Sequence, residues 1–219
     1  MLLASLLLPL VVCLLGLPAL LEESVKMAGF NVTRRYDGVF VLEIRDASGK
    51  ASQKLVNTVI ATSRVMYRGL MGPRKGRMQI SSYFGIPDKI QFANAFLMET
   101  ESKAFKRPPD CFALIIKESG LRVGVLAVHI DSDDAKMEMA ALYDVTQECQ
   151  RSAGTQNLII LGDMNANCKY LSEWDRNELR LRTDHRYKWL TGDGADTTVA
   201  KSDCAYDRLV LPSPIAANK

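Results

Sequence analysis

The sequence predicts a single α/β domain behind an apolar N-terminal leader. Three features of its 219 residues support this prediction: short apolar runs typical of buried strands, two longer segments with helical periodicity, and an ordinary composition. Hydrophobic residues make up 47% of the chain and charged residues 24%, as in soluble globular proteins, and the length suffices for one sizeable domain. The net charge of +3 is too small to indicate a nucleic-acid partner by itself.

The first 21 residues are almost wholly apolar and carry no charged side chain. Pro18 and the small residue Ala19 are typical of a signal-peptide cleavage region, and Glu22 begins the polar part of the chain. We therefore expect a secretory signal peptide over residues 1–21, a secreted domain over residues 22–219, and no stable membrane association after cleavage. The alternative is an uncleaved membrane anchor, because the apolar run approaches the length needed to span a bilayer.

The chain has five cysteines, of which Cys13 would be removed with the leader. The remaining four are an even number, which in an oxidising compartment is typical of disulfide-bonded proteins. Four cysteines allow three pairings, and their spacing does not select among them. Free buried thiols are the alternative, in particular for Cys149.

The N-terminal half of the domain contains three predicted strands and one predicted helix. The strands are expected at Val25–Val32, Val39–Asp46 and Met78–Phe84. The helix is expected over Lys50–Arg64, whose apolar residues fall on one side. Glu43 interrupts the second strand, and a carboxylate inside an apolar strand needs a cation or a hydrogen-bond donor. Residues 69–76 contain three glycines and one proline, so we predict a loop there.

A hairpin followed by a long helix is predicted in the middle of the chain. Phe112–Lys117 and Leu121–His129 are successive apolar runs separated by a Ser119-Gly120 turn. The second run ends at His129, and a lone histidine at such a place is more often structural than catalytic. An acidic loop then leads into a helix that ends near Ala153. The apolar face of this helix is expected to comprise Met137, Ala141, Leu142 and Val145.

Residues 157–168, with the sequence NLIILGDMNANC, combine a buried strand with a polar segment. Leu158–Leu161 is a continuous apolar run that fits a strand buried on both faces. Asp163 and Asn165 follow Gly162, and in an extended segment two such alternate side chains point the same way, toward one bound group. Polar groups at the carboxyl end of a buried strand lie where α/β folds place ligands. A strand followed by an Asn-rich turn is the alternative.

Four motifs between Leu158 and Leu211 occur in the order found in one known family. They are GDMNANC, LRLRTDHRYKWL, GADTTV and CAYDRLVL. In these motifs the chain resembles the secreted deoxyribonuclease I family, and the resemblance extends over most of Val25–Leu211. It implies an endonuclease/exonuclease/phosphatase-type sandwich of two packed β-sheets flanked by helices. It also implies hydrolysis of double-stranded DNA with the help of Mg²⁺ or Ca²⁺, which oxygen ligands bind.

The resemblance also implies roles for individual residues. The cation is expected to bind the oxygen-bearing side chains of Asn31, Glu43, Asp163 and Asn165. The catalytic positions are His129 as general acid and base, Asp163, Asp207, and Gln79 in place of the family's catalytic glutamate. Contacts with DNA are expected from Arg45, Arg77, Arg107, Asn165 and Tyr206. The implied disulfide is Cys168–Cys204, the implied solution state is a monomer, and actin binding stays open.

The chain departs from the family pattern in three ways. Asn31 and Glu43 are only 12 positions apart, which leaves no room for the family's first helix. Gln79 cannot carry the negative charge that would support an imidazolium. The family's last strands, which carry a second catalytic histidine, have no counterpart, because His129 and His185 are the only histidines.

From these departures we expect an incomplete domain, without the first helix and truncated at the C-terminus so that the last strands are missing. The expected function is that of a secreted metal-dependent endonuclease with impaired activity. The alternative is a catalytically inactive family member that binds DNA or a protein partner through the residual cleft.

Overall fold

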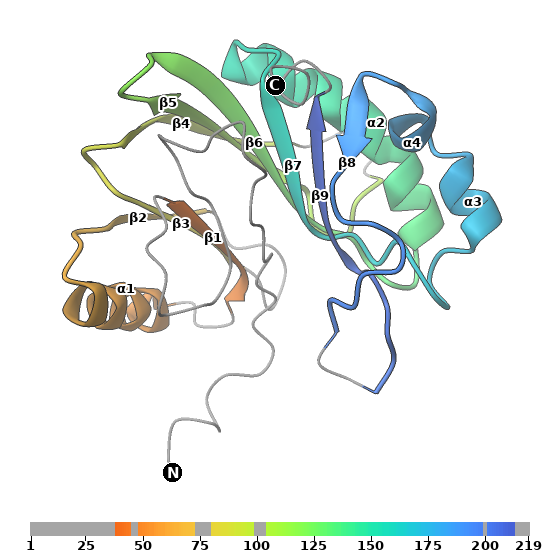
Figure 1. Ribbon diagram of the computed structural model, residues 1–219, viewed down its shortest axis with the longest axis horizontal. Coiled ribbons are helices and arrows are strands. Elements are labelled where there is room, and N and C mark those ends of the chain that lie inside the picture. The colour runs from red at the N-terminus through yellow and green to blue at the C-terminus, as the bar shows by residue number, and fades with distance from the viewer. Residues whose placement is uncertain (1–37, 45–47, 73–79, 99–103, 199–200, 213–219) are drawn as a thin grey trace.

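Two β-sheets face each other and carry helices on their outer sides (Figure 1). The structure is a computed structural model that describes residues 38–44, 48–72, 80–98, 104–198 and 201–212. The smaller sheet has the strand order β1-β3-β2, and the larger has the order β4-β5-β6-β7-β9-β8. This arrangement confirms the predicted α/β sandwich. The predicted leader and the predicted strand Val25–Val32 lie outside the described residues.

The smaller sheet pairs its strands antiparallel throughout. It consists of β1 (Gly38–Ile44), β2 (Arg68–Met71) and β3 (Ile80–Gly85). Helix α1 (Lys50–Ser63) covers the outer face by packing Val56 against Val41 and Tyr67, and its bounds agree with the prediction. The predicted loop over residues 69–76 is wrong at its start, because residues 68–71 pair with β3. Cross-strand pairing there outweighs the local tendency of glycine to form turns.

The larger sheet is mixed. It contains β4 (Ile90–Leu97), β5 (Asp110–Ile116), β6 (Leu121–His129), β7 (Leu158–Asp163), β8 (Tyr187–Trp189) and β9 (Asp207–Pro212). Strands β5 and β6 form the predicted hairpin, β6 and β7 are parallel, and β9 pairs antiparallel with β7. Strand β4 has no counterpart in the prediction, because its place at the sheet edge leaves most of its side chains exposed and its apolar pattern weak.

Helix α2 (Ala135–Ala153) connects β6 to β7 and covers the outer face of the larger sheet (Figure 1). Its buried apolar side chains include Met139, Leu142, Val145 and Cys149. The sequence predicts Met137 on this face, but that side chain is 55% exposed, because the buried face runs from Ala135 through Glu138 and Met139 to Leu142 at helical spacing and leaves Met137 on the outer side. Neither α2 nor any other helix of the described ranges is long and apolar enough to cross a bilayer.

Strand β7 is buried on both faces, which confirms the prediction for its apolar run. Leu158 and Ile160 pack on the side of α2, and the two residues that alternate with them pack in the core between the sheets. In that second core the Phe40 ring of β1 lies 5.5 Å from the Phe112 ring of β5, centroid to centroid. The aromatic contact therefore joins the two sheets directly.

Two disulfides cross-link the described part of the chain, Cys111–Cys149 and Cys168–Cys204. The second pair is the one implied by the family resemblance. The first pair replaces the alternative of a free thiol at Cys149. Both Cys111 and Cys149 are 0% exposed, so this bond ties β5 to α2 inside the core.

Candidate active site

Three titratable side chains lie in one row at the end of the larger sheet. The strand register places His129 of β6 opposite Asp163 of β7, and Asp163 opposite Asp207 of β9. The His129 Nε2 atom lies 3.8 Å from Asp163 Oδ2. Strands β6 and β7 end at this row and the antiparallel strand β9 begins there, so the sheet brings together three residues that the resemblance implies are catalytic.

The close approach of β6 and β7 beside this row depends on Gly162. A Cβ atom at this position would lie 1.9 Å from the carbonyl oxygen of Val128, which is backbone and cannot move aside cheaply. Gly162 also has a φ of 141°, which side-chain-bearing residues rarely adopt. The glycine therefore allows Asp163 to reach His129.

The Asp163 carboxylate is held in an environment that disfavours its ionised form. Burial raises the pKa of Asp163 from its ordinary 3.8 to about 6, although the N–H of Asn165 and the charge of Arg107 act in the opposite direction. A bound cation would favour the ionised form. Carboxylates perturbed in this way are found at catalytic and cation-binding sites more often than elsewhere.

Asn165 lies against Asp163, but not through the extended segment that the sequence predicts. Strand β7 ends at Asp163, and Asn165 has a left-handed φ of 45°. Its N–H donates to Asp163 Oδ1 at 2.9 Å, which forms an Asx turn. The Asn165 Nδ2 donates to the carbonyl of Ile130 at 2.8 Å, so Oδ1 is the amide atom that could coordinate a cation.

Arg107 reaches the row from the loop between β4 and β5. Its Nε donates to the carbonyl oxygen of His129 at 3.3 Å, and its guanidinium lies 3.4 Å from Asp131 Oδ2. The side chain is 22% exposed. The positive charge of Arg107 lowers the pKa of Asp163, against the effect of burial. The guanidinium therefore lies within electrostatic reach of the row. The contact between Arg107 and a phosphate stays a prediction.

Two tyrosines lie on neighbouring loops beside the row. The Tyr206 ring centroid is 5.2 Å from that of Tyr170, and Lys169 Nζ lies 4.8 Å from the Tyr170 centroid. The disulfide Cys168–Cys204 joins the same two loops. Tyr206 lies in a sequence motif of the family, whereas no motif marks Tyr170 or Lys169 as part of the site. Only the disulfide pairing could have shown that Tyr170 lies next to Tyr206.

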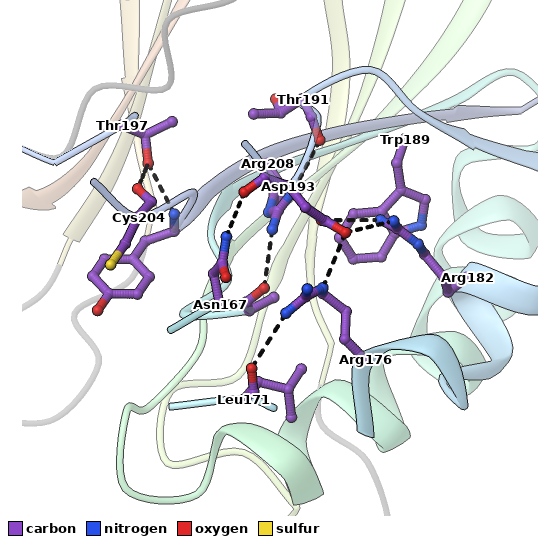
Figure 2. Close-up of polar contacts among 12 residues, drawn as sticks. Asn167, Leu171, Arg176, Arg182, Trp189, Thr191, Asp193, Thr197, Cys204 and Arg208 are labelled. Carbon is purple, nitrogen blue, oxygen red and sulfur yellow. Dashed lines mark hydrogen bonds and ion pairs between the residues drawn. The ribbon is translucent and has the colours of Figure 1, made fainter. Parts of the chain in front are cut away.

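A buried arginine supports the loops behind the row (Figure 2). Arg208 is 0% exposed and donates to the carbonyl oxygens of Ala166 and Thr191 at 3.0 and 2.9 Å. Its guanidinium also lies 2.9 Å from Asp193 Oδ1. Because Ala166 follows Asn165 directly, Arg208 fixes the turn that carries the amide side chain.

Asp193 is shared by three arginines (Figure 2). Besides Arg208, Arg176 and Arg182 approach the Asp193 Oδ2 atom at 3.2 and 2.8 Å. The Asp193 carbonyl also accepts from Asn167 Nδ2 at 2.8 Å. This network could not be predicted from the sequence, because Asp193 and Arg208 are 15 positions apart and no motif marks their pairing.

The predicted cation site is only partly described. Among the described residues, no group of three or more His, Cys, Asp and Glu side chains could hold a metal ion. Asp163 and Asn165 supply two oxygen-bearing side chains that fit a hard cation, and further ligands would have to come from elsewhere. The predictions whose side chains lie outside the described residues concern Asn31, Glu43, Arg45, Arg77 and Gln79.

Comparisons with known proteins bear on this site. No family model matches the chain. Deoxyribonuclease-1 of Oryctolagus cuniculus is 28% identical over 194 residues, which cover 84% of this chain and 69% of that protein. Deoxyribonuclease-1-like 2 of Mus musculus is 32% identical over 180 residues, which cover 80% of this chain and 65% of that protein. The chain is therefore similar to deoxyribonuclease-1 and its like-named relatives over 80–84% of its length. It spans 65–69% of the length of these two relatives.

Solved structures agree with this family on the fold. Truncated TDP2 of Caenorhabditis elegans matches with a TM-score of 0.56 and 15% identity over 83% of this chain and 72% of that one. An endonuclease/exonuclease/phosphatase from Bacteroides vulgatus matches with a TM-score of 0.54 and 16% identity over 81% of this chain and 73% of that one. The chain therefore has the predicted endonuclease/exonuclease/phosphatase fold.

Proposed function

We propose that the chain is a metal-dependent endonuclease that hydrolyses phosphodiester bonds of double-stranded DNA, with impaired activity. The observation that carries this proposal is the row of His129, Asp163 and Asp207 with Arg107 beside it. The row contains an imidazole that can transfer protons and two carboxylates, and the guanidinium beside it can contact a phosphate. The names of the relatives, deoxyribonuclease-1 and deoxyribonuclease-1-like 2, support DNA as the substrate.

The surroundings of each group favour a particular role. His129 is placed to take a proton from an attacking water or to give one to the leaving oxygen. Asp163 and Asn165 would bind Mg²⁺ or Ca²⁺ through oxygen atoms, together with Glu43 and Asn31. When bound, the cation would neutralise charge that develops on the phosphate.

Residues at the start of β9 complete the row. The N–H groups of Tyr206 and Asp207 both donate to Thr197 Oγ1, at 2.9 and 3.0 Å. These two bonds fix the backbone that carries the Asp207 carboxylate and the Tyr206 ring. Arg107, Asn165 and Tyr206 are then described residues that would contact DNA. Arg45 and Arg77 are further contacts in the proposal.

A second candidate function is DNA binding without hydrolysis. One observation favours it: apart from His129 the chain has one histidine, His185, which is exposed on the segment between α4 (Arg180–Thr183) and β8. The row therefore contains one imidazole, that of His129, and His185 does not add a second. Gln79, at the position where the family carries a catalytic glutamate, would weaken the remaining histidine further.

A plasmid-nicking assay with Mg²⁺, Ca²⁺ or EDTA separates the two candidates. We expect slow nicking that requires a divalent cation and is abolished in His129→Gln. The variant Gln79→Glu should nick faster by about a hundredfold, because a carboxylate would again support the imidazolium. DNA binding without nicking in both the wild type and Gln79→Glu would favour the second function. Absence of binding would contradict both.

We also propose that the protein is secreted and acts as a monomer. The apolar, uncharged residues 1–21 and the two disulfides support passage through an oxidising compartment. Expression in secretory cells should yield a product in the medium that lacks the leader. Light scattering on this material, alone and mixed with monomeric actin, tests the monomeric state and decides whether actin binds.

A further inference from the structure

The carboxylate of Glu138 joins two loops of the site from the first turn of α2. Its Oε1 accepts the backbone N–H of Lys106 at 2.8 Å, and its Oε2 accepts the backbone N–H of Asp131 at 2.9 Å. Glu138 is 0% exposed. Each oxygen therefore serves a different loop, one between β4 and β5 and the other between β6 and α2.

Each loop leads directly into a group of the row. Lys106 precedes Arg107, and Asp131 lies two residues after His129. The Arg107 side chain connects the two loops a second time. Its Nε donates to the His129 carbonyl at 3.3 Å, and its guanidinium pairs with Asp131 at 3.4 Å. Glu138 is thus connected to Arg107 through the backbone on one side and through Asp131 on the other.

We propose that Glu138 is a positioning residue that holds the Arg107 guanidinium beside His129 and Asp163, where it can contact a phosphate. The phosphate contact rests on the proposed function, whereas the network of hydrogen bonds does not. A fully buried carboxylate is costly unless hydrogen bonds compensate for the lost solvation. Two backbone donors provide that compensation here, and both belong to the loops that carry Arg107 and follow His129.

A surface ion pair links the same loops but is a weaker constraint. Lys106 Nζ lies 2.9 Å from both Asp131 and Asp134, and its side chain is 49% exposed. Water and salt screen exposed pairs of this kind, which contribute little to stability. The buried bonds of Glu138 are therefore the constraint that fixes the separation of the two loops.

Hydrogen exchange followed by NMR tests the positioning role without DNA. In Glu138→Gln one acceptor becomes a donor, so at least one of the N–H groups of Lys106 and Asp131 should exchange about tenfold faster. The Arg107 Nε–H should exchange faster as well. The matched control is Glu148→Gln on the same helix, 10 residues further on and so about 15 Å away. Unchanged exchange at Arg107 Nε–H would show that Glu138 only caps the loops, and would overturn the proposal.

A double-mutant cycle on DNA affinity tests the same point through the proposed function. The probe is a fluorescein-labelled duplex in EDTA at several salt concentrations. Arg107→Gln should weaken binding about tenfold and reduce the salt slope by about one. Glu138→Gln should weaken binding severalfold in the wild type, but not in the Arg107→Gln background. Equal effects in both backgrounds would overturn the positioning role.

The two experiments fail in different ways. If Arg107→Gln leaves DNA affinity and salt slope unchanged, the phosphate contact within the proposed function is wrong. In that case the exchange of the Arg107 Nε–H still decides whether Glu138 positions the guanidinium. If Arg107→Gln weakens DNA binding as expected but Glu138→Gln leaves the exchange of the Arg107 Nε–H unchanged, the proposed function stands and the positioning role of Glu138 is wrong.

Discussion

The Nε2 atom of His129 lies 3.8 Å from the Oδ2 atom of Asp163, although 34 positions separate the two residues in the chain. The parallel pairing of β6 and β7 produces this contact, because the crossover through α2 returns the chain to the same end of the sheet.

The raised pKa of Asp163 predicts how its removal affects stability. Because burial raises the pKa of Asp163 to about 6, ionising this group in the folded protein is unfavourable, and stability is lost as the pH rises through about 6. Asp163→Asn should therefore be more stable than the wild type by up to about 3 kcal/mol above pH 7, with little difference below pH 4. Urea unfolding at both pH values measures this. A difference that does not depend on pH would contradict the burial of the charge.

Asp193 is predicted to be more important for stability than an ordinary surface aspartate. Asp193→Asn leaves three guanidinium groups without their shared carboxylate, and one of them, Arg208, is fully buried. We expect a loss of about 3 kcal/mol or more in the free energy of unfolding, measured in urea. The exposed Asp203→Asn serves as a control and should change it by less than about 0.5 kcal/mol.

A second substitution should offset part of this loss. Arg182 is the most exposed of the three arginines, with 26% of its side chain accessible. Removing its charge in the Asp193→Asn background relieves repulsion among the remaining guanidinium groups. The double variant Asp193→Asn with Arg182→Gln should therefore be more stable than Asp193→Asn alone. Strict additivity would show that Asp193 and Arg182 are not coupled energetically.

The buried disulfide predicts a large effect on the unfolded state. Cys111–Cys149 closes a loop of 38 residues, and in the chain-entropy account such a cross-link contributes about 4 kcal/mol. The double variant Cys111→Ala with Cys149→Ala should lower the urea midpoint accordingly. Mass spectrometry after alkylation without reductant provides the control, since wild-type Cys111 and Cys149 should remain unmodified. An unchanged midpoint would contradict this contribution.

Tyr170 is predicted to contact DNA together with Tyr206. Truncating an aromatic side chain in a binding interface commonly costs more than about 1 kcal/mol, so Tyr170→Ala should weaken binding about tenfold. Fluorescence anisotropy with a labelled duplex in EDTA measures the affinity. Trp174→Ala is the control, because Trp174 is an aromatic residue that is 70% exposed on α3 (Glu173–Asn177). Similar losses in the two variants would mean that the effect is not specific to the site.

Local patterns in the sequence predict the central strands well. The run from Leu158 is continuous because β7 is buried on both faces, and the hairpin that ends at His129 has a clear turn. Strands β2 and β4 lie at sheet edges, where exposed side chains give little pattern. Their existence is decided by pairing with β3 and β5, which no local window contains.

The residues of the site likewise divide into those that the sequence predicts and those that only the fold reveals. The family resemblance identifies His129, Asp163 and Asp207, and the strand register then explains why they meet. The side chains that hold them in place are harder to predict. Glu138 looks like any acidic residue in the first turn of a helix, and Asp193 like any aspartate in a glycine-rich loop. Their partners are backbone groups or distant arginines, so only the folded chain shows what they do.

The close contact at Gly162 has a consequence for genetic variation. A Cβ atom there would overlap the backbone of β6, so every missense change at this codon should separate the two strands beside the row. A saturation library selected for DNA cleavage or DNA binding should therefore recover the wild-type codon and its synonyms alone. We therefore expect natural alleles that alter this position to disturb the row of His129, Asp163 and Asp207.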